Sequence, residues 1–313
     1  MLRVPVMSSV RPIRCVPATE AIPAAPGLIN RIRVLGVTAA STVPTPRAYY
    51  EPLGAGRFRS TVHAQGAWAQ EHQHMAPVSG LLVRAIEQCA PRDDLLVSRV
   101  AFDILGVIPT GEVEVRASVI RPGRTIELVE AEMTAGGRVV VRATAWRLAT
   151  SDTSEIAGSF VDVLPGPDHG APWHGTGIWG GGFIRTLDFR VLPGWKPGRG
   201  RVWIRTDVDL VDGAPSSTLA KYFSLIDTAN GIAVRADPAT LLFPNTDLTV
   251  HLVRRPVGPW VGFDTTVSFG ADGIGLTSSV LHDVSGPVGR AAQTLTLRPI
   301  GTVRPPPEAP FAT

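Results

Sequence analysis

The spacing of hydrophobic residues changes along this chain of 313 residues, and the same change occurs twice. In the first occurrence, the segment from Ala76 to Cys89 has apolar residues three and four positions apart, at Leu81, Leu82, Ala85, Ile86 and Cys89. This spacing predicts an amphipathic helix. From Glu112 to Trp146, apolar and polar residues alternate instead, which predicts antiparallel strands joined by short turns.

The second occurrence has the same order of elements. A helix is predicted from about Pro215 to about Ile232, and alternating segments follow it at Leu248–Val253, Val261–Phe269, Leu276–His282 and Gly289–Leu297. A pattern that repeats at this scale indicates two copies of one structural unit. The predicted fold class is therefore α+β, a double hotdog in which two tandem units each wrap an antiparallel sheet around a long helix. A fold of this kind can hold an acyl chain inside its apolar interior.

The predicted domain organisation follows from where the patterns start and stop. The chain is 44% hydrophobic, which is enough for a substantial core, and its length makes two domains the default expectation. Segments rich in proline, glycine and small residues separate the patterned parts. We predict an N-terminal extension rich in Pro and Arg (1–47), a first hotdog domain (48–150), a linker (151–181), a second hotdog domain (182–300) and a C-terminal tail (301–313).

Composition excludes several classes of partner. The net charge is +3 and the arginines are scattered, so the chain lacks the basic stripe of a nucleic-acid-binding protein. No segment approaches the ~20 apolar residues of a membrane span. With only Cys15 and Cys89, a disulfide framework is not expected, which favours a reduced, cytoplasmic compartment.

The common catalytic motifs are absent from the sequence. It has no G-x-S-x-G, no H-E-x-x-H, no G-x-x-x-x-G-K, and no G-x-G-x-x-G between a strand and a helix. Their absence disfavours a serine hydrolase, a metallohydrolase, an NTPase and a dinucleotide enzyme. His72 and His74 have a metal-like spacing, but no cysteine or carboxylate cluster accompanies them, so we predict neither a metal nor a cofactor.

Three polar residues stand out in the second repeat. Asp227 interrupts the predicted apolar helix, Asn245 precedes a strand, and Gln293 lies within the last strand, where Thr144 is its counterpart in the first repeat. A buried carboxylate must be paired or must face a cleft. One carboxylate and two amides are suited to positioning a water and removing its proton. The alternative is that Asp227 bonds nearby backbone and Asn245 forms a turn after Pro244.

Five segments together resemble the double-hotdog acyl-CoA thioesterases of the thioesterase II type. The resemblance spans about residues 48–300 and is carried by Tyr50–Phe58, Gln73–His74, Asn245–Leu252, Asp272–Leu276 and Gly286–Leu295. In that family an Asp on the second helix, a Thr at the start of the next strand and a Gln on the last strand position the attacking water.

The resemblance implies three catalytic residues in this chain. Asp227 matches the aspartate and Gln293 the glutamine. Strand phase puts Asn245 at the threonine position, and a shift of one residue would put Thr246 there. The chain also departs from the family at Asp103–Pro109, where an arginine is usual.

The implied activity is hydrolysis of a fatty acyl-CoA to the free acid and CoA by direct attack of water. Gln73, His74 and Thr246 are the implied substrate-binding residues, although Gln73 and His74 could instead cap the first helix. A homodimer or homotetramer is expected. One alternative is a non-catalytic protein that binds acyl groups or acyl-CoA. The other is a hotdog dehydratase or hydratase, which needs a histidine–carboxylate pair near the helix start.

Overall fold

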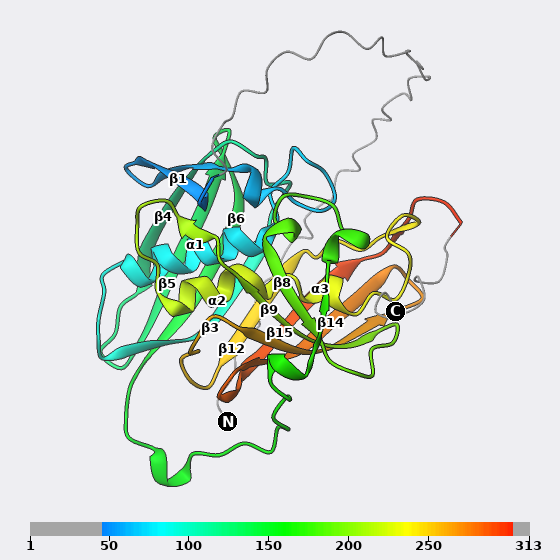
Figure 1. Cartoon of the computed structure of the whole chain (residues 1–313). Coiled ribbons are helices and arrows are strands. Elements are labelled where there is room, and N and C mark those ends of the chain that lie inside the picture. The colour runs from blue at the N-terminus through cyan, green and yellow to red at the C-terminus, as the bar shows by residue number, and fades with distance from the viewer. Residues whose placement is uncertain (1–45, 303–313) are drawn as a thin grey trace, which may run out of the picture. The chain divides into compact units, whose positions relative to one another are not determined.

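The computed structural model describes residues 46–302, and Figure 1 shows that they form a large sheet with helices against it. The first repeat contributes β1 (Ala48–Gly54), β2 (Arg57–Ser60), α1 (Met75–Gln88), β3 (Leu95–Ile104), β4 (Glu112–Arg121), β5 (Ile126–Ala135) and β6 (Arg138–Ala149). The predicted extension (1–47) and tail (301–313) lie almost wholly outside the described residues.

The second repeat contributes the remaining elements. Its strands and helices are β7 (Ala171–Trp173), β8 (Leu187–Val191), β9 (Arg199–Thr206), β10 (Asp209–Val211), α2 (Thr218–Ile226), α3 (Ala229–Ile232), β11 (Leu241–Leu242), β12 (Asp247–Leu252), β13 (Val261–Phe269), β14 (Ile274–Asp283), β15 (Gly286–Thr296) and β16 (Arg298–Pro299). The segment predicted as a linker, 151–181, supplies β7, which pairs with β8. No helix within residues 46–302 has the length and apolar character needed to cross a membrane.

The strand order shows that the two repeats are related by an approximate two-fold axis. The order is β10-β1-β2-β4-β5-β6-β3-β12-β15-β14-β13-β9-β8-β7. At its centre, β3 and β12 run antiparallel with Val100 opposite Val250, and both residues are fully buried. Outward from this pair, β6, β5 and β4 on one side correspond to β15, β14 and β13 on the other.

The sequence around α1 explains where this helix begins and ends. The His74 side chain caps its N-terminus by accepting a hydrogen bond from the backbone N–H of Ala76 over 3.1 Å. At the other end, Ala90 adopts a left-handed backbone conformation and Pro91 follows it, so the helix cannot continue.

The second predicted helix is shorter than the sequence indicated. We predicted one helix from about Pro215 to about Ile232, whereas α2 ends at Ile226 and α3 starts at Ala229. The break has a local cause, because the Thr228 side chain and backbone N–H both donate to the Leu225 carbonyl, over 2.5 and 3.2 Å. This tight turn places Asp227 between the two helices.

The helices α1 and α2 pack against each other and against one face of the sheet (Figure 1). Gly80 permits their close approach, since a Cβ at this position would lie 2.7 Å from the Ser224 Cβ. Beside it, the Ser79 hydroxyl lies 2.7 Å from the Phe223 carbonyl oxygen and donates to it. The observed architecture is the predicted double hotdog, with a main hydrophobic core that draws on both repeats and a small second cluster at Leu164, Leu192 and Trp203.

Candidate active site

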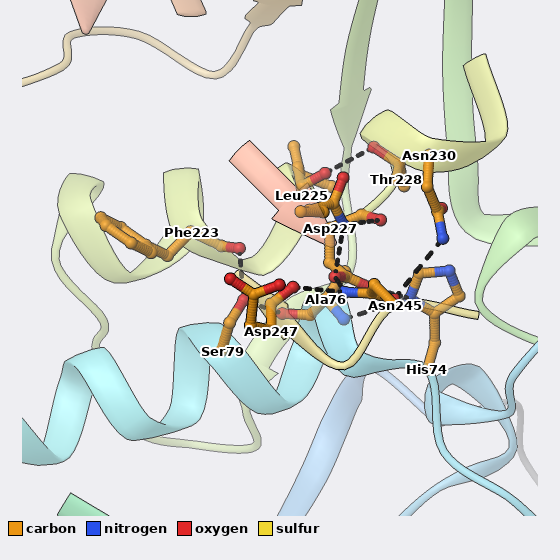
Figure 2. Close-up of polar contacts among 11 residues, drawn as sticks. His74, Ala76, Ser79, Phe223, Leu225, Asp227, Thr228, Asn230, Asn245 and Asp247 are labelled. Atoms are coloured by element: carbon orange, nitrogen blue, oxygen red, sulfur yellow. Dashed lines mark hydrogen bonds and ion pairs between the residues drawn. The ribbon is translucent and has the colours of Figure 1, made fainter. Parts of the chain in front are cut away.

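The site is centred on Asp227, at the C-terminal end of α2. This aspartate is 3% exposed, and Figure 2 shows it facing Asn245. The Asn245 side-chain amide donates to Asp227 Oδ1 over 2.7 Å, and the Gln293 amide donates to the same oxygen over 2.8 Å. The structure thus brings together the three residues predicted to be catalytic, and we refer to them as the amide cluster.

The amide cluster leaves one carboxylate oxygen available. Both amides converge on Asp227 Oδ1, and no described residue donates a hydrogen bond to Oδ2. Asn245 is itself held in place, because its amide nitrogen also donates to the Asp247 carbonyl over 3.1 Å. The carboxylate is therefore oriented through one oxygen while the other can accept a proton from a ligand or a water.

Burial sets the protonation behaviour of this carboxylate. Desolvation raises the pKa of Asp227 to about 7, against the lowering effect of the hydrogen bonds from Asn245 and Gln293. The negative charge of Asp247 adds to the rise. A carboxylate with a pKa near neutrality can both take and return a proton at physiological pH, as a general base and acid must.

His74 lies beside the carboxylate but does not form an ion pair with it. Its Nδ1 is 3.8 Å from Asp227 Oδ2, and burial lowers the pKa of the imidazole to about 3, so the ring is neutral. Because Nδ1 accepts from the Ala76 N–H, the ring proton is on Nε2. His74 therefore cannot donate from Nδ1 to Asp227.

A cavity of about 150 Å³ opens beside this cluster, and both repeats line it. Asp227 and Asn245 come from the second repeat, and Gln73 and His74 come from the first. Both polar atoms of the Gln73 side-chain amide are hydrogen-bonded. Its oxygen accepts from the Tyr50 hydroxyl, and its nitrogen donates to the Pro109 carbonyl. Its role here is to hold the chain before α1.

Thr246 is placed differently from the other predicted residues. Its side chain is exposed and is not part of the cavity wall. Its backbone N–H donates to the Thr294 carbonyl, and its carbonyl accepts from the Ile104 N–H. Between the two alignments left open by the sequence, the structure places Asn245, and not Thr246, against Asp227.

The start of α1 offers one free backbone donor to the cavity. The N–H of Ala76 is used by His74, and Pro77 has none. The N–H of Met75 is in the first turn, has no intrahelical acceptor, and meets no other acceptor among the described residues. Met75 also lines the cavity, so this N–H can stabilise negative charge there.

Sequence reasoning missed two polar residues near the amide cluster. Asn230 donates to Asn245 Oδ1 over 3.5 Å (Figure 2), but its position in the sequence, in the short helix α3, carries no catalytic pattern. Thr277 lies directly opposite Gln293 on the neighbouring strand. Its buried hydroxyl and Gln293 Oε1 both lack a hydrogen-bond partner in the described part of the chain, so one internal water could satisfy both.

Residues 46–302 contain no group of three or more His, Cys, Asp or Glu side chains arranged to hold a metal ion. The chemistry available to the cluster is therefore that of a carboxylate, two amides, a neutral imidazole and a backbone N–H.

Two family models match the sequence, one for each repeat. Residues 64–148 match the acyl-CoA thioesterase N-terminal domain, and residues 160–297 match the acyl-CoA thioesterase C-terminal domain. Together the two matches cover more than half of the chain, in the order that the family requires. No protein with a curated description is significantly similar to it.

Solved structures share the fold at low sequence identity. A candidate thioesterase II from Thermobifida fusca is 16% identical, with a TM-score of 0.60 over 80% of this chain and 96% of that protein. A hotdog-fold protein of unknown function from Alicyclobacillus acidocaldarius is 12% identical, with a TM-score of 0.63 over 84% and 99%.

A third structure extends the same likeness. It is the acyl-CoA thioesterase II of Mycobacterium marinum, 17% identical with a TM-score of 0.57 over 82% of this chain and 97% of that one. These structures establish the fold, and the two domain models establish the family. The chain belongs to the acyl-CoA thioesterase family and is a double-hotdog thioester hydrolase of the thioesterase II type.

Proposed function

We propose that the protein hydrolyses fatty acyl-CoA thioesters to the free acid and CoA, using a water activated by Asp227. The observation that carries the proposal is the amide cluster. Two amides hold one oxygen of a buried carboxylate, and the other oxygen is free beside a cavity shared by both repeats.

The proposed reaction has two steps and no covalent acyl-enzyme. Deprotonated Asp227 accepts a proton from water through Oδ2 as the water oxygen attacks the thioester carbonyl carbon. The negative charge that develops on the carbonyl oxygen is stabilised by the Met75 N–H at the start of α1. When the intermediate collapses, the carbon–sulfur bond breaks and the proton on Asp227 passes to the CoA sulfur.

An aromatic wall supports binding of an apolar acyl group. A small space of about 30 Å³ adjoins the cavity and is lined by Trp68, Trp179 and Phe189, among others. Trp68 and Trp179 contact each other edge to face, with ring centroids 5.2 Å apart. We propose that the acyl group lies along this wall, with its carbonyl toward Asp227.

The direct test is release of free thiol from acyl-CoAs of increasing chain length. Asp227→Asn keeps the side-chain size and is expected to lower kcat/KM by about 10²- to 10⁴-fold, the usual contribution of a general base. Asp272→Asn, in an exposed turn, is the matched control and should leave turnover unchanged. Equal turnover by the two variants would refute the role of Asp227.

A dehydratase or hydratase is the second candidate, and the position of His74 favours it. His74 precedes α1 and lies 3.8 Å from the Asp227 carboxylate, which is the kind of pair that this chemistry requires. The neutral ring could exchange a proton only through Nε2. Incubation with a 2-enoyl-CoA separates the two reactions, because hydration removes the enoyl absorbance without releasing thiol.

The third candidate is a protein that binds acyl groups without catalysis. Such a protein would bind acyl-CoA but would neither release thiol nor hydrate the enoyl group.

Assembly into a homodimer or homotetramer stays a prediction. Size-exclusion chromatography with light scattering on the eluted protein would test it.

A further inference from the structure

The opposite end of the helix pair repeats the arrangement found at the active site. At the active site, the residue capping α1, His74, lies beside the carboxylate that follows α2, Asp227. At the other end, the residue capping α2, Ser217, lies beside a carboxylate in the last turn of α1, Glu87. Here Ser217 Oγ donates to Glu87 Oε2 over 2.5 Å.

The strands carry the same equivalence. Asn245 lies opposite Leu295, and at the corresponding place in the first repeat Leu95 lies opposite Ala149. Leu95 therefore occupies the position of Asn245.

The counterpart of Gln293 follows from the same register. Val250 pairs with Ala291, two residues before Gln293, and Val100 pairs with Ala145, two residues before Arg147. The counterpart of Gln293 is thus Arg147. Our prediction of Thr144 was wrong, because the strand pairing aligns Ala291 with Ala145 and therefore Gln293 with Arg147.

A second cavity lies at this end, which we call the twin cavity. Its volume is about 390 Å³, against about 150 Å³ at the active site. Its apolar wall comes from β3, the start of α2 and the segment after β12, through Leu95, Leu96, Val97, Leu219, Leu252 and Val257. Such a wall suits an aliphatic chain.

Positive charge is concentrated at one side of the twin cavity. Arg255 lines it and forms no hydrogen bond or ion pair through its guanidinium in the described part of the chain. Arg147 also lines it, is 4% exposed, and has a buried Nε without an acceptor among residues 46–302. The first backbone N–H groups of α2, at Thr218 and Leu219, have no intrahelical acceptor and add partial positive charge.

Three acidic side chains lie in this region, because Glu87 and Asp93 line the cavity and Glu127 lies beside Arg147. The Arg147 guanidinium forms a buried ion pair with Glu127. Burial raises the pKa of Glu87, while the hydrogen bond from Ser217 and the positive charge of Arg255 act to lower it. Arg255 is exposed and forms no ion pair among the described residues, so it is the cation that an anionic head would meet in this part of the cavity.

The twin cavity lacks the groups that would make it catalytic. Leucine and arginine replace the two amides, so nothing holds a carboxylate as Asn245 and Gln293 hold Asp227. We propose that the twin cavity is a binding site for a fatty acid, whose carboxylate lies between Arg255 and the start of α2 and whose chain follows the leucine wall. This site is separate from the catalytic one, and its occupancy does not depend on the proposed hydrolysis.

The test is calorimetric titration of the full-length protein with dodecanoate, with dodecanol as the uncharged comparison. Two variants alter exposed parts of the cavity, Arg255→Glu and Val257→Asp, the latter at a side chain that is 45% exposed. Each is expected to weaken dodecanoate binding about tenfold or more, by repelling the carboxylate or by placing a charge in the apolar wall. The matched controls are Arg290→Glu and Val253→Asp, at exposed positions outside the cavity, and they should bind as the wild type does.

A photoreactive diazirine analogue of dodecanoate locates the site independently. After irradiation, labelled peptides are expected from 95–97 and 252–257, in the wild type and in Asp227→Asn alike. Labelling confined to 66–75 would place the acid in the active-site cavity and overturn the proposal. So would dodecanol binding as tightly as dodecanoate, or absence of dodecanoate binding by the wild type. Because Asp227→Asn abolishes only the proposed hydrolysis, the two proposals fail by different results.

Discussion

Removing the charge of Asp227 should stabilise the fold at neutral and alkaline pH while it abolishes activity. Burial raises the pKa of this carboxyl from its ordinary value of 3.8 to about 7. The folded protein therefore holds the proton more tightly than the unfolded chain does. Below pH 3.8 both states are protonated, so the burial of a charge costs nothing there.

The magnitude follows from the two pKa values. As pH rises from 3.8 toward 7, the unfolded chain ionises first, and the folded state progressively loses stability relative to it. A shift of about three units at about 1.4 kcal/mol per unit gives a loss of about 4 kcal/mol above pH 7. The Asp227→Asn variant has no charge to bury, so its free energy of unfolding does not decrease in this way.

The groups that face Asp227 do not reverse this expectation. Burial lowers the pKa of His74 to about 3 in the folded protein, so acid destabilises the fold through the imidazole. That effect falls between about pH 3 and 6.5 and is common to wild type and variant, so it cancels in their difference. The negative charge of Asp247 raises the pKa of Asp227, in the same direction as burial does.

The assay is urea unfolding of the wild type and Asp227→Asn from about pH 4 to about pH 8. The variant's free energy of unfolding, less that of the wild type, should increase through this range by up to about 4 kcal/mol and then level off. The exposed control Asp272→Asn should follow the wild type at every pH. A constant difference between Asp227→Asn and wild type would refute the reasoning, because it would mean that Asp227 has the same pKa in both states.

Three further outcomes are expected from the same structure. The kcat/KM of the wild type should rise with pH through about 7, as Asp227 loses its proton, and a rate that falls over this range would contradict its role as base. In the thiol-release assay, Asn245→Ala should lower kcat by about tenfold or more, because it removes the 2.7 Å hydrogen bond to Asp227. Asn245→Thr supplies a hydroxyl donor in its place and should recover part of that loss. Gly80→Ala should lower the free energy of unfolding by about 1–2 kcal/mol, because the new Cβ would lie 2.7 Å from the Ser224 Cβ. This clash should outweigh the higher helix propensity of alanine. A rise in the melting temperature would contradict the prediction, because it would mean that α1 and α2 can move apart without a loss of stability.

The sequence pattern predicted most of the fold because local periodicity determines which residues are buried. Val261–Phe269 was predicted as a strand and forms β13 with the same bounds, and Ala76–Cys89 differs from α1 by one residue at each end. The break after Ile226 was missed because no proline interrupts the segment and apolar residues continue on both sides of it, up to Ile226 and again at Ala229 and Ile232. It depends on the Thr228 side-chain hydrogen bond, which has no periodic signal.

The site was predicted in part for a similar reason. Asp227 and Gln293 stood out as polar residues at buried positions, and strand phase selected Asn245 over Thr246. The closeness of His74 to Asp227 was not predicted. It depends on how the two helices cross, and that crossing depends on the small side chains at their contact rather than on any pattern along the chain.

The strand pairing within each repeat explains why an amide cluster occurs at only one end of the helix pair in the described part of the chain. Gln293 and Thr277 lie opposite each other at the active site, and the equivalent pair in the first repeat is Arg147 and Glu127, both buried. A buried ion pair is stable only while both partners remain, and loss of one costs about 3–5 kcal/mol. Replacing Arg147 alone with an amide would therefore leave Glu127 buried and unpaired, so a single substitution cannot convert the twin cavity into a second amide cluster. The duplicated fold thus has a cavity at each end of the helix pair, with two amides around Asp227 at one and the Arg147–Glu127 ion pair at the equivalent place of the other.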